Sequence, residues 1–109
     1  MKRINYKLAF ISSPFQDRVT NQKLARKYTN KFMKMKKYKD CIPVVPHLLY
    51  PQLNVTEKKA IEYCRGLLQR CDYLVVCGNK ITPGMEKEIE VAGEMGLPVI
   101  KISLKEAQR

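Results

Sequence analysis

The sequence lacks the segments that carry a protein into or across a membrane. No apolar run approaches the roughly 20 residues that a transmembrane helix needs, so no membrane partner is expected. Lys7 interrupts the stretch after Met1-Lys2-Arg3 in which a signal peptide would have its apolar region. The sequence therefore predicts a cytoplasmic protein.

Metal-ligating residues are also scarce. The chain has one histidine, and its four cysteines show none of the paired spacings that are typical of zinc sites. A metal site is not expected, and no motif indicates a cofactor. The cysteines are predicted to be reduced thiols, which agrees with a cytoplasmic location.

Acidic residues are few in the first 40 positions. These positions hold 12 of the 21 lysines and arginines but only Asp17 and Asp40, so they carry +10 of the net charge of +11. Such a bias permits contact with nucleic acid or attraction of a small polyanion, and a solvated helix face explains it equally well. Four lysines within 34–39 end a helix predicted over residues 21–38, where cations complement the helix dipole. No aromatic-basic pattern of an RNA-binding sheet is present, so nucleic acid is not the expected partner.

Short apolar runs alternate with helical patterns along the chain. Strands are predicted at residues 7–11, 41–45, 73–77 and 97–102, and helices at 21–38, 56–70 and 82–96. This alternation predicts one α/β domain over residues 1–109. Its expected architecture is a three-layer, Rossmann- or flavodoxin-like parallel sheet of four to five strands with helices on both faces. Pro43 indicates that the second strand lies at an edge or starts there.

The last two helices have clear start signals. Thr56 and Thr82 are good N-cap residues, because a hydroxyl can accept a free backbone N–H of the first turn. Pro83 suits the first helical position, where its missing N–H costs nothing. Gly84 allows a ligand to approach the helix N-terminus closely.

Glu88 stands apart from the other acids of the helix predicted at 82–96. Helical phase places Met85 on the core face and both Glu86 and Glu90 on the opposite, solvated face. Glu88 instead projects at the edge of the apolar side. From this geometry alone, it is either part of a pocket or a mildly misplaced surface residue.

Three predicted loops follow strands and therefore lie at one edge of the sheet. They span residues 12–15, 46–52 and 78–84, and ligands of open parallel sheets bind outside the carboxyl ends of the strands. In the first loop, Ser12 and Ser13 offer hydroxyls and backbone amides that suit an anion or a sugar. The second mixes His47 and Tyr50 with apolar residues, which fits either a small-molecule pocket or a packed loop with a buried histidine. Glu88 would face the same crevice, and this favours the pocket.

These motifs resemble the nucleoside 2-deoxyribosyltransferase-like superfamily, more specifically its small members from bacteria and phages. The resemblance covers the chain from about Leu8 to Ile102. It rests on Ser-Ser-Pro-Phe at 12–15, Pro-His-Leu-Leu-Tyr-Pro-Gln at 46–52, Cys71-Asp72 before an apolar strand, and the stretch 84–92. This last stretch matches the superfamily's Gly-x-x-x-Glu-aliphatic-x-x-Ala.

The resemblance implies chemistry at the N-glycosidic bond of a nucleoside or nucleotide. In characterised members the motif glutamate is the nucleophile that attacks C1′ of the sugar, and that role falls on Glu88. The residues that the resemblance implies as ligand contacts are Ser12, Ser13, Pro14, Phe15, His47, Tyr50, Asp72, Gly78, Thr82, Gly84 and Met85. Taken by itself, Asp72 at a strand start is more typical of a polar tie for the preceding loop. The resemblance also implies a homo-oligomer in which neighbours complete each site.

Two positions depart from the superfamily pattern. Thr82 stands where the transferases have Asp, whereas the 5′-monophosphate N-glycosidases have a hydroxyl residue that contacts phosphate. A 5′-phosphorylated ligand is therefore favoured. Cys64 lies near the position of a helix Asp of the characterised enzymes, and Glu62 is turned away from it. This loss supports an alternative, a non-catalytic binder or sponge of a nucleotide-derived signalling molecule used in phage defence or anti-defence. A basic nucleic-acid-binding module is the third hypothesis.

Overall fold

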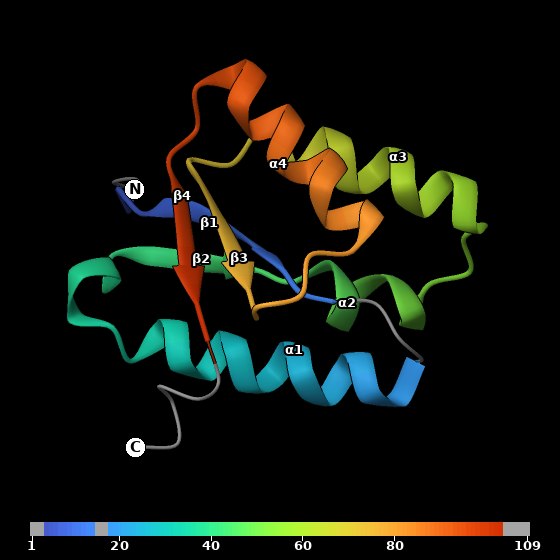
Figure 1. Cartoon of the computed structure of the whole chain (residues 1–109), viewed down its shortest axis with the longest axis horizontal. Coiled ribbons are helices and arrows are strands. Elements are labelled where there is room, and N and C mark those ends of the chain that lie inside the picture. Colours follow the sequence, from blue (N-terminus) through green and yellow to red (C-terminus); the bar gives the residue numbers. More distant parts are fainter. Residues whose placement is uncertain (1–3, 15–17, 104–109) are drawn as a thin grey trace.

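The computed structural model describes residues 4–14 and 18–103, in which strands and helices alternate (Figure 1). The strands are β1 (Lys7–Ser12), β2 (Cys41–Val44), β3 (Tyr73–Cys77) and β4 (Val99–Ile102). The α-helices are α1 (Arg18–Met33), α2 (Pro46–Leu49), α3 (Glu57–Leu68) and α4 (Pro83–Met95). Two 3-10 turns, η1 (Lys36–Tyr38) and η2 (Tyr50–Gln52), follow α1 and α2.

The strands form one parallel sheet in the order β2-β1-β3-β4. Helix α1 covers one face of this sheet, and α3 and α4 cover the other (Figure 1). The three-layer α/β architecture predicted from the sequence is thus confirmed, with four strands in the part that the structure describes. Strand β2 lies at an edge, as Pro43 indicated. Because all strands are parallel, their carboxyl ends lie together at one end of the sheet, and their amino ends lie at the other.

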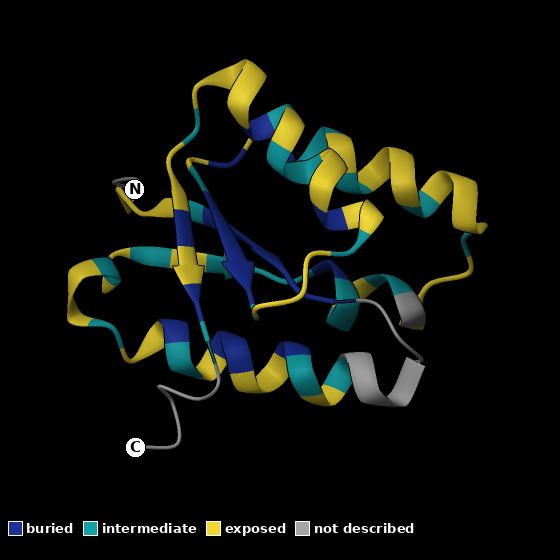
Figure 2. Cartoon of the chain, viewed as in Figure 1, coloured by how far each residue is buried: buried dark blue, intermediate teal, exposed yellow. Residues whose placement is uncertain are grey.

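Alternate residues of the central strands pack on opposite faces, as the period of two requires. Ile11 and Val75 pack against Phe32 of α1. Phe10 and Val76 pack on the other side, against α3 and α4. The central strands are therefore buried on both faces, and Figure 2 shows them as the darkest part of the molecule.

Helix α1 is shorter at its C-terminal end than the prediction of 21–38. It begins at Arg18 and ends at Met33, and extended backbone at Met35 separates it from η1. The physical reason is the packing of Tyr38, whose ring stacks on Phe32 with centroids 5.4 Å apart. Six residues further along a continuous helix, Tyr38 would lie about 120° around the helix axis from Phe32 and off the core face. Breaking the helix returns this ring to the core.

Residues 46–52 were predicted as a loop, but they form α2 and η2. Pro46 occupies the first turn of α2, where its fixed φ favours a helix and no N–H is needed. The helix starts at α3 and α4 agree with prediction. Thr56 Oγ1 accepts from Lys59 N at 3.2 Å, and Thr82 Oγ1 accepts from Met85 N at 3.3 Å. Within the described residues, no helix is long and apolar enough to cross a bilayer.

Candidate functional site

Glu88 is held at the carboxyl end of the sheet by a residue far away in the chain. The hydroxyl of Ser12, at the end of β1, donates to Glu88 Oε1 over 2.7 Å. Ser12 is buried on the side of the sheet that α3 and α4 cover, and its hydroxyl therefore reaches Glu88 in the second turn of α4. This bond occupies one carboxylate oxygen of Glu88 and leaves Oε2 for other contacts.

The surroundings of Glu88 change its ionisation. Burial raises the pKa of Glu88 to about 7, because the charged form loses its hydration. The hydrogen bond from Ser12 acts in the opposite direction and lowers this pKa, since it stabilises the carboxylate. Near neutral pH the carboxyl therefore exists in both forms, a property that is common at functional sites.

Glu88 lines a groove of about 670 Å³ between α3 and α4. The helix start Thr82-Pro83-Gly84 forms one end of this groove. Its walls are mostly apolar and include Ile61, which is 56% exposed. The other lining residues are Glu57, Ala60, Cys64, Arg65, Leu68, Lys87 and Val91. Such a groove is large enough for a ligand of nucleotide size.

Cys64 lies beside Glu88 in this groove. Burial raises the pKa of the Cys64 thiol to about 12, and the negative charge of Glu88 adds to the effect. The thiol is therefore neutral at physiological pH. It gives the site neither a second negative charge nor a readily ionised acid.

Tyr50, in the α2–η2 segment, lies near Cys64 but does not line the groove. Its ring centroid lies 6.0 Å from that of Tyr63 on α3. Burial raises the pKa of the Tyr50 hydroxyl, and proximity to Cys64 and Tyr63 contributes in the same direction. The structure thus brings Tyr50, Cys64 and Glu88 into one neighbourhood, although these residues come from three separate elements.

His47 and Ser13 form a second contact near the end of β1. His47 Nε2 lies 3.2 Å from the carbonyl oxygen of Ser13. Burial lowers the pKa of His47, because the imidazolium would lose its hydration. Ser13 is 2% exposed, and its hydroxyl has no hydrogen-bond partner among the described residues. His47 is thus partly buried and contacts a backbone carbonyl, which agrees with the interpretation of residues 46–52 as a packed loop with a buried histidine.

Gly78 follows β3 in a conformation that side chains rarely adopt. Its φ is +90°, and a Cβ placed there would lie 2.8 Å from the Tyr28 hydroxyl oxygen and 3.7 Å from Pro14. Gly78 and Pro14 therefore pack the loops at the carboxyl ends of β1 and β3 together. Neither residue lines the groove that contains Glu88.

Two of the predicted ligand contacts, Asp72 and Met85, make structural contacts in the fold. Asp72 lies at the amino end of β3, and its Oδ2 accepts from the backbone N–H of Leu8 at 2.8 Å. Asp72 thus lies at the amino end of the sheet, whereas Glu88 lies at the carboxyl end. Its hydrogen bond to Leu8 is the kind of backbone contact that an aspartate at a strand start typically makes. Met85 is 1% exposed and packs in the core against the sheet. Phe15 lies outside the described residues.

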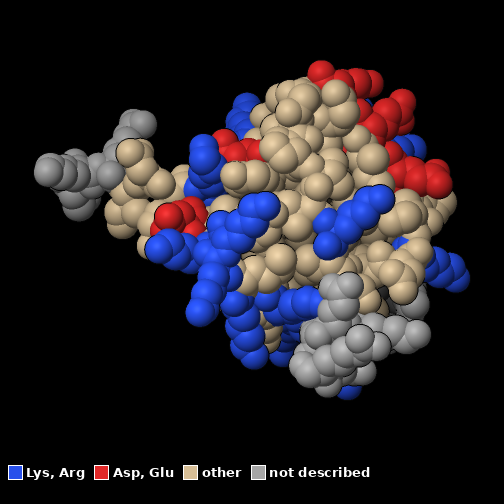
Figure 3. Space-filling model, turned by 60° about the vertical axis from the view of Figure 1, so that its left-hand side comes forward, with Lys and Arg blue, Asp and Glu red and all other residues tan. Residues whose placement is uncertain are grey.

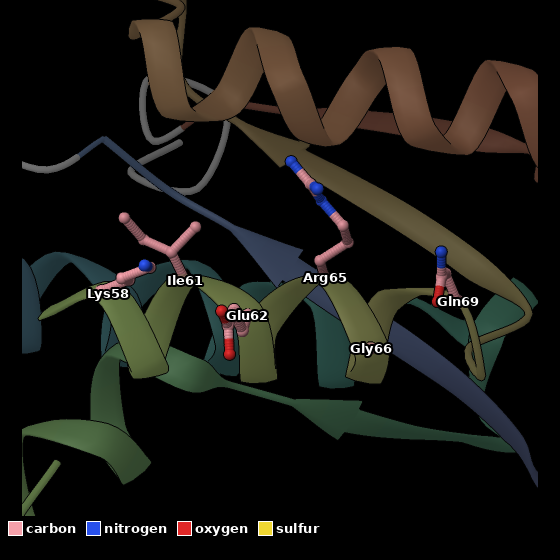
Figure 4. A pocket seen from close by; sticks show the side chains of 6 residues that line it. All are labelled: Lys58, Ile61, Glu62, Arg65, Gly66 and Gln69. Carbon is pink, nitrogen blue, oxygen red and sulfur yellow. The ribbon is translucent and has the colours of Figure 1, made fainter. Parts of the chain in front are cut away.

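The sequence analysis missed the cations of the groove. Arg65 extends from α3 toward the neighbouring helix, and it also borders a smaller hollow of about 380 Å³ on α3 (Figure 4). Lys87 faces the groove from α4. The signal was weak, because single cations on predicted surfaces are common. Among the described residues no cluster of three potential ligands could hold a metal ion.

Residues 7–102 match the family model described as a domain of unknown function, DUF7768. The chain belongs to the DUF7768 family. A comparison of this DUF7768 chain with curated proteins finds no match.

One solved structure to which the DUF7768 chain is similar is a 2-desoxiribosyltransferase from Leishmania mexicana. The TM-score is 0.66, with 18% identity over 89% of this chain. The match covers 64% of the other protein, so the chain spans less than two thirds of its length. At this identity the likeness shows the fold, and it confirms that the fold is the deoxyribosyltransferase-like one that the motifs indicated.

Proposed function

We propose that this protein binds a nucleotide or nucleoside in the groove between α3 and α4 and cleaves its N-glycosidic bond, with Glu88 as nucleophile. The observation that carries the proposal is the placement of Glu88. Its carboxyl is largely withdrawn from water, lines the groove, and is oriented through Oε1 by the Ser12 hydroxyl. A carboxylate that is fixed in this way can attack an anomeric carbon with Oε2.

The reaction proceeds in two displacements. A bond forms between Glu88 Oε2 and C1′ of the sugar while the bond from C1′ to the base nitrogen breaks, and the base leaves with a proton taken from solvent. Water then attacks C1′ and loses a proton to solvent, the ester bond breaks, and the carboxylate of Glu88 is restored. If a second base replaces water, the same intermediate gives transfer instead of hydrolysis.

A 5′-phosphorylated ligand suits the groove better than a neutral nucleoside. The hydroxyl of Thr82 accepts from Met85 N and keeps its own proton, which it can donate to a phosphate oxygen. Gly84 exposes backbone in the first turn of α4, where the helix dipole favours an anion. Arg65 and Lys87 add positive charge along the walls.

The test is incubation with purine and pyrimidine nucleoside 5′-monophosphates, in ribo and deoxy form, followed by chromatography of the released base. Glu88→Gln is expected to reduce release by roughly a thousandfold or more, because it removes the nucleophile. Glu90→Gln is the matched control, since Glu90 is an exposed acid on the same helix. Equal release by wild type and Glu88→Gln, or no release from any substrate, would contradict cleavage.

A second candidate is a binder that sequesters a nucleotide-derived signalling molecule without turnover. Cys64 favours this alternative, because a neutral thiol stands next to Glu88 where a second carboxyl would assist the leaving group. In this case the ligand would be recovered intact from the purified protein. Wild type and Glu88→Gln would both leave it unchanged after long incubation.

The proposal includes a cytoplasmic location and a homo-oligomer. The described cysteines are all free thiols, which suits a reducing compartment. Several groove residues, among them Ile61 and Lys87, are exposed to solvent, and a neighbouring subunit that covers the groove would exclude water from Glu88. Light scattering coupled to size-exclusion chromatography tests the second point, and a monomer at micromolar concentration would contradict it.

A further inference from the structure

The outward face of α1 presents a basic stripe, interrupted by the exposed residues Asn30 and Met33. Lys23, Arg26 and Lys27 are exposed and lie opposite the core residues Ala25 and Phe32 on the helix. The stripe continues past the helix end through exposed lysines, namely Lys34, Lys36, Lys37 and Lys39. Figure 3 shows lysine and arginine side chains spread over the middle and lower part of this face, and acidic side chains mostly in its upper part.

The structure removes the simplest local explanation of this stripe. A helix dipole accounts for cations in the last turn, and the basic residue there is Lys31, which also donates to the carbonyl of Ser103 at 2.6 Å. The lysines from 34 to 39 lie beyond Met33, where the helix ends. The only acid from Arg18 to Asp40 is Asp40 itself, so this surface has almost no internal compensation of its charge.

The length of the stripe indicates which kind of anion it can bind. From Lys23 to Lys34 the chain advances roughly 16 Å at 1.5 Å per residue, and η1 extends it further. A single phosphate cannot neutralise cations that are so far apart. Duplex nucleic acid carries one negative charge per about 1.7 Å of its axis, so several phosphates would face the stripe at once.

We propose that the α1–η1 stripe binds the phosphate backbone of double-stranded nucleic acid without sequence preference. Single-strand binders stack bases on aromatic side chains. On α1 the aromatic residues Tyr28 and Phe32 are buried, and Tyr38 stacks on Phe32. An anionic bilayer fits less well, because an interfacial helix inserts its apolar face and that face of α1 is buried against the sheet.

The stripe is separate from the groove that contains Glu88. Helix α1 covers one face of the sheet, and the groove lies between the helices that cover the other (Figure 1). Binding at the stripe and chemistry at Glu88 can therefore be tested independently.

The experiment measures binding of a fluorescent 20-base-pair duplex by anisotropy between 50 and 200 mM salt. The variant Lys23→Glu/Arg26→Glu/Lys27→Glu tests the stripe. Its matched control is Lys58→Glu/Lys59→Glu/Lys80→Glu, which makes the same change of net charge at exposed positions on or beside the other face. A single-stranded oligonucleotide of the same length and vesicles with anionic lipid are the competing ligands, and circular dichroism confirms that both variants fold.

The wild type is expected to bind the duplex with an affinity that falls steeply with salt. The stripe variant is expected to bind at least about tenfold more weakly and to lose roughly 2 to 3 from the salt slope, because three phosphate contacts are removed. The control is expected to keep the wild-type slope. Absence of duplex binding at 50 mM salt, an equal loss in the control, or tighter binding to single strands or vesicles than to duplex would each overturn the proposal.

Discussion

The hydroxyl of Ser12 donates a hydrogen bond of 2.7 Å to Glu88 Oε1 and so joins the end of β1 to the second turn of α4. Both residues were predicted as site residues, but Ser12 was expected to contact ligand. In the structure its proton is committed to the carboxylate. Ser12 is therefore a positioning residue, which determines how Glu88 is oriented and how easily it ionises.

Ser12→Ala is expected to raise the pKa of Glu88 above its value in the wild type, since the hydrogen bond that stabilises the carboxylate is lost. If Glu88 is the nucleophile, the acidic limb of the pH–rate profile moves to higher pH by the same amount. Carbon NMR titration of the Glu88 carboxyl measures the pKa without any need for turnover. Ser12→Thr keeps the hydroxyl and should restore the wild-type titration, and an unchanged pKa in Ser12→Ala would contradict the role of the bond.

Glu88 also makes the stability of the protein depend on pH. Burial raises its pKa from 4.5 to about 7, so the folded state holds this proton more tightly than the unfolded state. The stabilising contribution is fully present below about pH 4.5 and is lost as pH rises through about 7. Glu88→Gln removes a contribution that would change by up to about 3 kcal/mol across this window. Its free energy of unfolding, relative to wild type, should therefore be larger at pH 8 than at pH 5, as urea denaturation can measure. Glu90→Gln serves as control and should show no such trend.

Gly78→Ala is expected to destabilise the fold. The φ of +90° strains any other residue, and the added methyl group would meet the Tyr28 hydroxyl at 2.8 Å. Backbone strain of this kind costs about 1 to 3 kcal/mol. The same substitution in a Tyr28→Phe background lacks the hydroxyl and should cost less, as chemical denaturation would show. An equal cost in both backgrounds would mean that backbone strain alone is responsible.

Thr56 and Thr82 form a natural pair of caps. Each accepts a backbone N–H three residues later, so alanine at either position should cost about 1 kcal/mol of unfolding free energy. Only Thr82 lines the groove with Glu88. Thr82→Ala is therefore expected to weaken binding of a nucleoside 5′-monophosphate, measured by calorimetry, whereas Thr56→Ala is not. Thr82→Ser should keep both properties, and equal affinities of the two alanine variants would rule out a ligand contact from Thr82.

Local signals explain which parts of this structure were predictable. The start of α4 follows from Thr82 and Pro83, and the buried strands follow from short apolar runs. The end of α1 does not, because it depends on a ring contact between Tyr38 and Phe32 that forms only in the folded chain. The contact of Glu88 with Ser12 was unpredictable for the same reason. The motif identified Glu88, but Ser12 is 76 positions away and no local pattern shows where its hydroxyl points.

Cys64→Asp tests the effect of a second carboxyl beside Glu88, at the position where the protein has a thiol. A second carboxyl in this buried neighbourhood would share a proton with Glu88, because two negative charges at short range are costly. The pair is then expected to titrate in two steps, the higher of them above the wild-type value of about 7. Unfolding experiments should accordingly show a larger loss of stability between pH 6 and 8 than in wild type. Cys64→Asn controls for the change of side-chain size, because it matches Asp in shape without the ionisable carboxyl. If Cys64→Asp also increases the release of base from a nucleoside monophosphate, the thiol limits catalysis. If the titration shifts but no base is released, the groove is better suited to binding than to cleavage.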